Sequence, residues 1–171
     1  MSEPSGLESL YRELILDHYR RPRGKDLAPT FDAESFQVNP VCGDEVRLRV
    51  KLGAASSDEL GGTDILGQVT WTGTGCSISQ ASTSVMCELV RGEDLGRVAE
   101  LEAAFGRLMH SRGLGLESEA DEDALGDAIA FEGVAKYPAR VKCALLGWMA
   151  LKDALAKAVA GDSSPAPGPK G

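Results

Sequence analysis

The sequence predicts an α+β fold, in which a three-stranded antiparallel sheet (a meander) packs against several helices. Segment 45–52, EVRLRVKL, alternates charged and apolar residues without exception, which is typical of a strand with one buried face. Apolar residues recur at helical spacing over much of the C-terminal half. Because the expected strands come early and most helices late, we expect the strands to pair with one another directly.

The first expected element is a helix over about residues 7–20. Its apolar residues recur every three or four positions, and Pro22 and Gly24 follow where it should end. His18 lies in its last turn. We expect it to make a hydrogen bond there in preference to binding a metal.

Three strands are expected next, joined in sequence order. Phe36 and Val38 indicate a short first strand, 45–52 is the second, and 64–72 is the third, after a loop rich in small residues at 53–63. On the second strand we expect the four charged residues to face solvent and these residues to face the core: Val46, Leu48, Val50 and Leu52. On the third strand, the expected core residues are Ile65, Val69 and Trp71.

The expected helices of the second half cover about 78–89, 94–110, 122–131 and 138–159. Ser77 and Ser79 are candidate caps of the first, and Pro138 suits the first turn of the last. We expect a single domain over residues 1–160. The low-complexity composition of 161–171 predicts a disordered tail.

Composition and charge exclude several classes of protein. The 171 residues include 18 basic and 26 acidic side chains, a formal charge of -8, which argues against a nucleic-acid partner. Apolar runs fall short of membrane-spanning length, so no membrane association is expected. The N-terminus, MSEPSG, lacks the features of a secretory signal. We therefore expect a cytoplasmic protein, whose cysteines indicate metal ligands, catalytic thiols or buried residues in preference to disulfides.

Three of the four cysteines, Cys42, Cys76 and Cys143, fall at the edges of expected elements. Cys87 lies inside the helix that Cys76 opens, eleven residues further on. That separation is roughly 16 Å of helix, at about 1.5 Å per residue. The two sulfurs therefore cannot bind one metal, and we expect Cys87 to be buried and structural.

Asp44 follows Cys42 by two residues. In an extended backbone the two side chains point to the same side, and Gly43 between them leaves the chain free to turn. Three thiolates and one carboxylate suffice for a tetrahedral zinc site. The chain lacks C-x-x-C pairs, however, so buried unreactive thiols remain the alternative interpretation.

Four stretches resemble the IscU/NifU-like proteins of iron-sulfur cluster assembly: YRELILDHYRRPR (11–23), NPVCGD (39–44), GCSISQASTS (75–84) and RVKCA (140–144). The resemblance extends over about residues 7–155. Two features are similar to the SufU branch. Lys142 stands where IscU-type scaffolds carry a histidine, and the segment between Cys76 and Cys143 is longer, which suggests an insertion near 111–132. In addition, YPARV (137–141) departs from the chaperone-docking motif of IscU-type scaffolds.

The resemblance implies the SufE/NifU (IscU-like) fold and a zinc-dependent sulfur-transfer protein. Its partners would be a cysteine desulfurase of the SufS type and, downstream, SUF scaffold proteins. Cys42, Asp44, Cys76 and Cys143 would bind zinc. Cys42 would accept the persulfide sulfur after a partner residue takes its place on the metal, and Arg140 would assist near Cys143.

Two alternatives remain open. The same cysteines would also hold a [2Fe-2S] cluster, as on an IscU-type scaffold, although Lys142 in place of histidine argues against it. A binding module with a purely structural zinc, docking through its N-terminal helix, is the second alternative. The positions of Pro40 and Gly43 around Cys42 favour a thiol that can move, and hence sulfur transfer.

Overall fold

The computed structural model describes residues 6–54 and 64–168 of the chain. Its elements, in order, are α1 (Gly6–Arg20), β1 (Ala33–Asn39), β2 (Asp44–Ala54), β3 (Asp64–Thr74), α2 (Ser77–Val90), α3 (Leu95–Met109), α4 (Glu119–Leu125), the 3-10 helix η1 (Gly126–Lys136) and α5 (Pro138–Val159). The expected α+β class is therefore confirmed, as are the expected positions of α1, α2, α3 and α5. The predicted loop at 53–63 lies largely outside the described residues.

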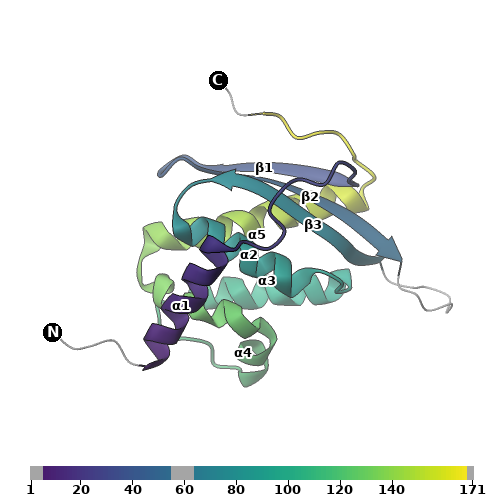
Figure 1. Cartoon of the computed structure of the whole chain (residues 1–171). Helices are drawn as coiled ribbons and strands as arrows, with labels where there is room; N and C mark the ends of the chain where they lie inside the picture. Colours follow the sequence, from purple (N-terminus) through teal and green to yellow (C-terminus); the bar gives the residue numbers. More distant parts are fainter. Residues whose placement is uncertain (1–5, 55–63, 169–171) are drawn as a thin grey trace.

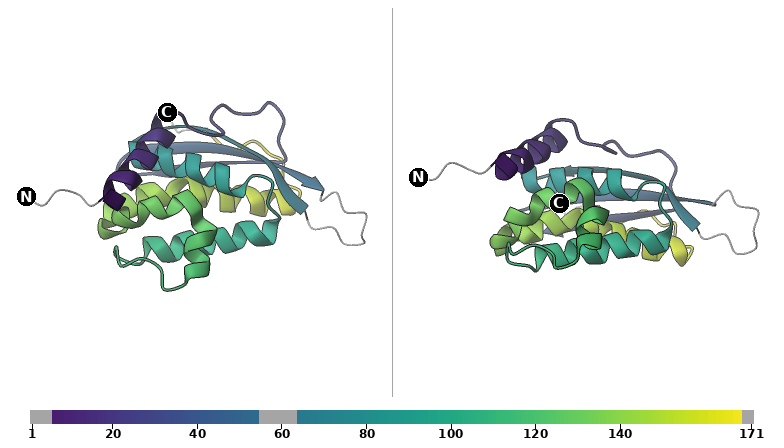
Figure 2. Two further views of the ribbon diagram at one scale, coloured as in Figure 1. Left: turned by 60° about the horizontal axis from the view of Figure 1, so that its bottom comes forward. Right: turned by 90° about the horizontal axis from the view of Figure 1, so that it is seen from below.

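The described strands form one antiparallel sheet in the order β1-β2-β3. The helices gather on one side of this sheet, and the long α5 runs beneath β1 and β2 (Figures 1 and 2). α2 packs against α5, and α1 packs against α2. No helix in the described part of the chain is long and apolar enough to span a bilayer.

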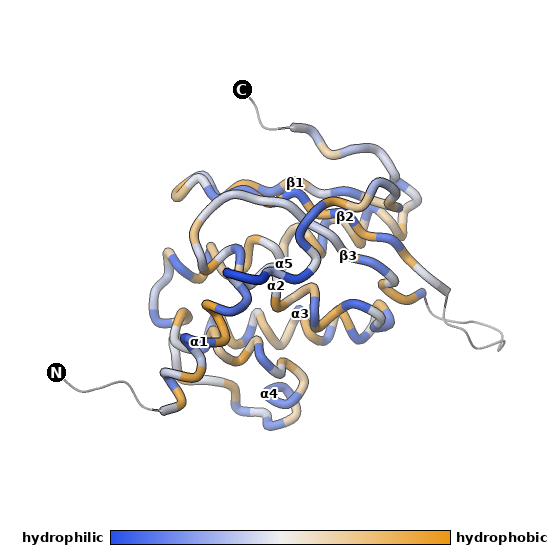
Figure 3. Tube along the Cα trace, in the orientation of Figure 1, coloured by the Kyte–Doolittle hydropathy of each residue, from blue (hydrophilic) through white to orange (hydrophobic). Residues whose placement is uncertain are grey.

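The core lies between the inner face of the sheet and the helices. Val46, Leu48 and Val50 are each at most 2% exposed, as predicted. Deeper in the helical layer, the ring of Phe105 stacks on Trp148 with centroids 4.7 Å apart and meets Phe131 edge-on. Figure 3 shows hydrophobic residues recurring along the helices between hydrophilic ones. Aliphatic and aromatic packing thus fixes the sheet against α5.

The predicted inner face of the third strand is wrong at one position. Leu66 is fully buried and Ile65 is only half-buried. The pairing of β2 with β3 shifts after Lys51, so that Gly67 has no partner in the ladder. A bulge of this kind inserts one residue and reverses the side-chain alternation beyond it.

The outer face of the sheet differs from the expected solvated row of charges. Arg47 and Arg49 do point outward, but both bind the carboxylate of Glu34, which is 1% exposed. The backbone N–H of Ala166 also donates to Glu34 Oε1, at 3.0 Å. Residues 161–168 run along this side of the sheet (Figure 1). Disorder of the whole 161–171 tail stays a prediction.

The predicted helix at 122–131 is wrong in type and extent. α4 ends at Leu125, because Gly126 has a φ of +50° that breaks the α-helix, and the chain continues from Gly126 as the 3-10 helix η1. Leu125 and Phe131 are completely buried. This segment therefore contributes to the core, whether or not it is an insertion.

Candidate metal centre

Cys42 lies in the turn that joins β1 to β2. Residues 40–43 form this turn, which is closed by a 2.7 Å hydrogen bond from Gly43 N to Asn39 O. Gly43 has a φ of +74°, which suits glycine and few other residues. The structure brings Cys42 near Asp44 through this turn, and not through the extended backbone that we expected. The turn leaves Cys42 exposed.

Asp44, the first residue of β2, points inward and is 3% exposed. Its Oδ1 accepts a hydrogen bond from Cys76 N at 3.1 Å, and its Oδ2 lies 3.3 Å from Cys76 Sγ. The residue before Cys76, Gly75, allows this approach, because a Cβ there would lie 2.6 Å from Asp44 Cγ. Asp44 is thus held at the N-terminus of α2, where the helix dipole favours an anion.

The predicted capping of α2 by Ser77 or Ser79 is wrong. Cys76 is the N-cap residue, and in the described structure its own side chain makes no capping hydrogen bond. The carboxylate of Asp44, from another element, satisfies the N–H group of Cys76 instead. Ser79 donates backwards to Cys76 O at 3.0 Å.

Cys143 lies in the second turn of α5 and is 5% exposed. Its sulfur is 3.6 Å from Cys42 Sγ and 3.9 Å from Asn39 Nδ2. Burial, together with the neighbouring Cys42, Asp44 and Cys76, raises the pKa of the Cys143 thiol well above its usual range. The buried thiol needs a nearby cation to ionise, and a bound metal ion supplies one.

Burial alone would raise the pKa of Asp44, but hydrogen bonds from Cys42, from the Cys76 backbone and thiol, and from Cys143 lower it overall. The site therefore has a carboxylate that is ionised at neutral pH. It is surrounded by three thiols, each of which is able to become an anionic ligand.

Three of the four predicted ligands form a group that could hold a metal ion, and Cys76 lies outside this group but close to Asp44. Ligand atoms of Cys42, Asp44 and Cys143 all lie within 4.8 Å of one another. With Zn–S bonds of about 2.3 Å and Zn–O bonds of about 2.0 Å, tetrahedral geometry separates two sulfurs by roughly 3.7 Å and sulfur from oxygen by roughly 3.5 Å. In the structure, Cys42 Sγ lies 3.6 Å from Cys143 Sγ, and Cys76 Sγ lies 3.3 Å from Asp44 Oδ2.

The remaining sequence candidates lie apart from these ligands. Arg140 and Lys142 are exposed on α5, and among the described residues neither side chain has a hydrogen bond or ion pair. The assisting role of Arg140 stays a prediction. Cys87 is buried, as predicted, and burial raises the pKa of its thiol to about 12.

His18 makes the hydrogen bonds expected of a histidine at a helix end. Its Nδ1 is 2.8 Å from Ser84 Oγ, and its Nε2 is 3.3 Å from Glu88 Oε2. Glu88 and Asp127 would complete a second group of possible metal ligands. However, the guanidinium of Arg23 lies 3.7 Å from Glu88 and would repel a metal cation there.

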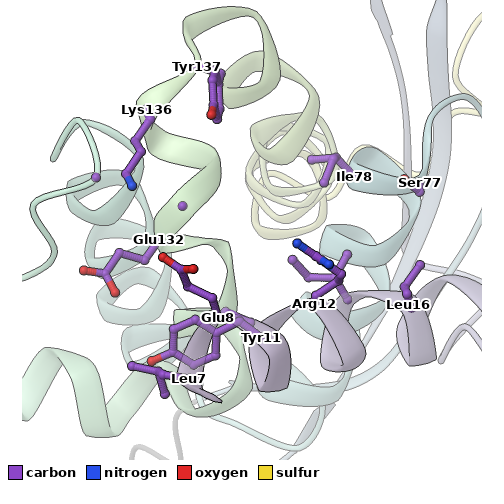
Figure 4. A pocket seen from close by; sticks show the side chains of 14 residues that line it. Leu7, Glu8, Tyr11, Arg12, Leu16, Ser77, Ile78, Glu132, Lys136 and Tyr137 are labelled. Carbon is purple, nitrogen blue, oxygen red and sulfur yellow. The ribbon is translucent and has the colours of Figure 1, made fainter. Parts of the chain in front are cut away.

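Of the cavities described, one of about 630 Å³ lies between α1, the start of α2 and the chain leading into α5 (Figure 4). Tyr11, Ile78 and Tyr137 line it, whereas the four ligand residues do not. A smaller one, of about 470 Å³, lies beside Ile78 and Arg140. The thiol cluster at the end of the sheet is therefore separate from both of these cavities.

Sequence reasoning assigned no role to two residues of this site, Asn39 and Gly75. Both stand in the stretches that drew attention to Cys42 and Cys76. A glycine directly before a cysteine at the end of a strand is the available signal for Gly75. Nothing in the sequence separates Asn39 from an ordinary polar residue that precedes proline.

The three thiols and one buried carboxylate at one end of the sheet define a small α+β protein with a thiol-rich candidate metal centre. Residues 10–144 match the family described as NifU-like N terminal domain, and the chain belongs to that family.

Two curated relatives and one solved structure are similar over most of their length. The chain is 38% identical to the zinc-dependent sulfurtransferase SufU of Bacillus subtilis, covering 95% of this chain and 100% of the relative. It is 35% identical to the iron-sulfur cluster assembly scaffold protein IscU of Streptococcus pyogenes, covering 88% and 86% respectively. A SUF-system scaffold protein from Fervidobacterium islandicum has a structure with a TM-score of 0.67 at 34% identity, covering 88% and 99%. The resemblance to this family and the predicted IscU-like fold are thus confirmed.

Proposed function

We propose that this protein is a zinc-dependent sulfurtransferase of iron-sulfur cluster assembly, which accepts sulfur on Cys42 from a cysteine desulfurase of the SufS type. The unequal placement of the thiols carries the proposal. Cys42 is exposed on a turn, whereas Cys143 is buried on a helix and Asp44 is buried on a strand. A partner protein can reach the first thiol while the rest of the site stays in place.

Cys42, Asp44, Cys76 and Cys143 would hold the zinc. When bound, zinc keeps the thiols deprotonated and moderates their nucleophilicity until a partner docks. The Cys42 sulfur then attacks the terminal sulfur of a persulfide on the desulfurase. A bond forms between Cys42 Sγ and that sulfur, the S–S bond of the partner breaks, and the partner's cysteine leaves as a thiolate. The reaction moves one sulfur atom and needs no external oxidant or reductant.

The position of Cys42 in the backbone allows its side chain to reach a partner protein. Cys42 is exposed on the short turn between Pro40 and Gly43, so that its side chain can rotate toward a partner without disturbing β2. Asp44 remains bonded to Cys76 N, and Cys143 is fixed by α5. We further propose that SUF scaffold proteins accept the sulfur downstream. The cysteines, all free in the structure, suit the reducing conditions of the cytoplasm.

An IscU-type scaffold for a [2Fe-2S] cluster is the second candidate, because similar proteins carry the name scaffold. Lys142 argues against it, because the resemblance implies a histidine at this position in IscU-type scaffolds, and here the residue is an exposed lysine. Protein purified without oxygen should contain about one zinc per chain, given four ligands. Stable iron and sulfide that transfer to an apo-acceptor would favour the scaffold instead.

The proposal is tested by comparing Cys42→Ala with Cys87→Ala. Each variant is mixed with a SufS-type desulfurase, cysteine and a reductant, and alanine release is measured. We expect Cys42→Ala to lose at least nine-tenths of the stimulation, roughly a tenfold effect or more, because the accepting sulfur is gone. Cys87→Ala should stimulate like the wild type. Full stimulation by Cys42→Ala would rule out the relay and leave a structural zinc.

A further inference from the structure

We propose that Asn39 is a positioning residue of the metal centre, which donates a hydrogen bond to the Cys143 sulfur and thereby leaves Cys42 as the reactive thiol. The inference rests on the proposed function. It gives Asn39, which is not a metal ligand, a role in the site that the resemblance does not imply.

Asn39 connects the Cys42 turn to the helix that carries Cys143. It is the last residue of β1, is 6% exposed, and pairs with Asp44 across the hairpin. Its backbone oxygen accepts from Gly43 N at 2.7 Å, and its Oδ1 accepts from Val41 N at 3.2 Å. One side-chain atom and one backbone atom therefore fix the shape of the turn.

The bond to Val41 also determines the orientation of the amide. Since Oδ1 is occupied by an N–H donor, the NH₂ group must point the other way. There Nδ2 lies 3.9 Å from Cys143 Sγ, which is within the range of a weak hydrogen bond to the large sulfur atom. A buried amide is thus aimed at one of the three ligand sulfurs.

This hydrogen bond distinguishes the two neighbouring thiols. An N–H donor stabilises negative charge on sulfur, and outer partners of this kind orient metal ligands and tune the site. In the described part of the chain, no N–H group donates to the sulfur of Cys42. The Cys143 thiolate is therefore the stabilised ligand, and Cys42 is the sulfur that is free to react.

The test compares Asn39→Ala and Asn39→Asp with the wild-type protein. Both variants lose the N–H donor, but aspartate keeps an oxygen for Val41 N and nearly the same shape. Gln37→Glu is the matched control, because Gln37 lies two residues earlier on β1 and its amide bonds Ser35 instead. Zinc affinity is measured by competition with a chelator. The alkylation rates of Cys42 and Cys143 are measured by mass spectrometry with and without zinc, and circular dichroism monitors folding.

We expect both Asn39 variants to bind zinc about 10- to 100-fold more weakly, while the rate of Cys143 alkylation relative to Cys42 rises about tenfold. Gln37→Glu should match the wild type in both measurements. An effect of Asn39→Ala alone would assign Asn39 only to the shape of the turn, and an effect of Asn39→Asp alone would reflect added charge. Either result, or an unchanged alkylation ratio, overturns the inference. A wild-type protein that binds no zinc overturns the proposed function separately, since the alkylation ratio of the metal-free protein still tests the hydrogen bond.

Discussion

Replacing Gly75 by alanine should weaken the metal centre although no ligand residue is replaced. The new Cβ would lie 2.6 Å from Asp44 Cγ and 2.9 Å from its Cβ, and nearer still to Oδ1. The carboxylate must therefore move away and give up its hydrogen bond to Cys76 N. A lost hydrogen bond to a charged group costs about 1.5–3 kcal/mol. If that cost falls on the bound state, zinc affinity decreases by about 10- to 100-fold.

Gly75→Ala also carries a backbone cost, because its φ is +148°. Such strain lowers the free energy of unfolding by about 1–3 kcal/mol. Gly92→Ala separates the two effects, since Gly92 has a φ of +84° and nothing within 4 Å of the position of its Cβ. Both variants should unfold at lower denaturant concentration, but only Gly75→Ala should lose zinc in a chelator competition. Zinc affinities of Gly75→Ala and Gly92→Ala that agree within threefold would refute the reasoning.

Two further predictions concern the stability of the fold. Glu34→Gln should lower the free energy of unfolding by about 3 kcal/mol, since it leaves Arg47 and Arg49 without their buried anion. Burial opposes ionisation of Glu34, but hydrogen bonds from Arg49, the Ala166 N–H and Arg47 lower its pKa overall. The stabilisation by Glu34 is therefore present above the pKa that this residue has in the unfolded chain, and it is lost as the pH falls through the pKa of the folded state. Urea titrations should show a smaller difference in stability between variant and wild type in acid, and an equal difference at all pH values would contradict this. Gly147→Ala should destabilise the protein by about 1–3 kcal/mol, because its Cβ would collide with Thr83 where α5 crosses α2. The control Gly106→Ala, which has open space in α3, should not lower the melting temperature, and equal melting temperatures for the two variants would count against a tight crossing.

The strand 45–52 was predictable because the inward positions of β2 alternate regularly from Val46 to Val50. The same rule failed at Leu66, because a bulge depends on how two strands pair and not on either strand alone. The prediction that the charged residues of this strand simply face solvent was incomplete for a similar reason. Glu34, the residue that binds Arg47 and Arg49, stands on another strand.

At the candidate metal centre, Cys42, Asp44 and Cys143, which the structure brings together, stood out in the sequence because thiols and a carboxylate are chemically distinctive. Their supporting residues did not. Asn39 and Gly75 act through contacts with Cys143 and Asp44, which are distant in the sequence. Such roles follow from the tertiary structure, and a single sequence carries no periodic or compositional sign of them.

The distance along the chain between Cys42 and Cys143, 101 positions, also bears on how the protein is made. At about 5–20 residues per second of synthesis, roughly 3–13 s pass between the addition of Cys76 and that of Cys143. During this interval the nascent chain carries two thiols and a carboxylate, but not the helix that closes the site. Contacts of such long range form late in folding. If the protein has the proposed function, a complete zinc site therefore forms only after α5 has been made and has packed against the sheet.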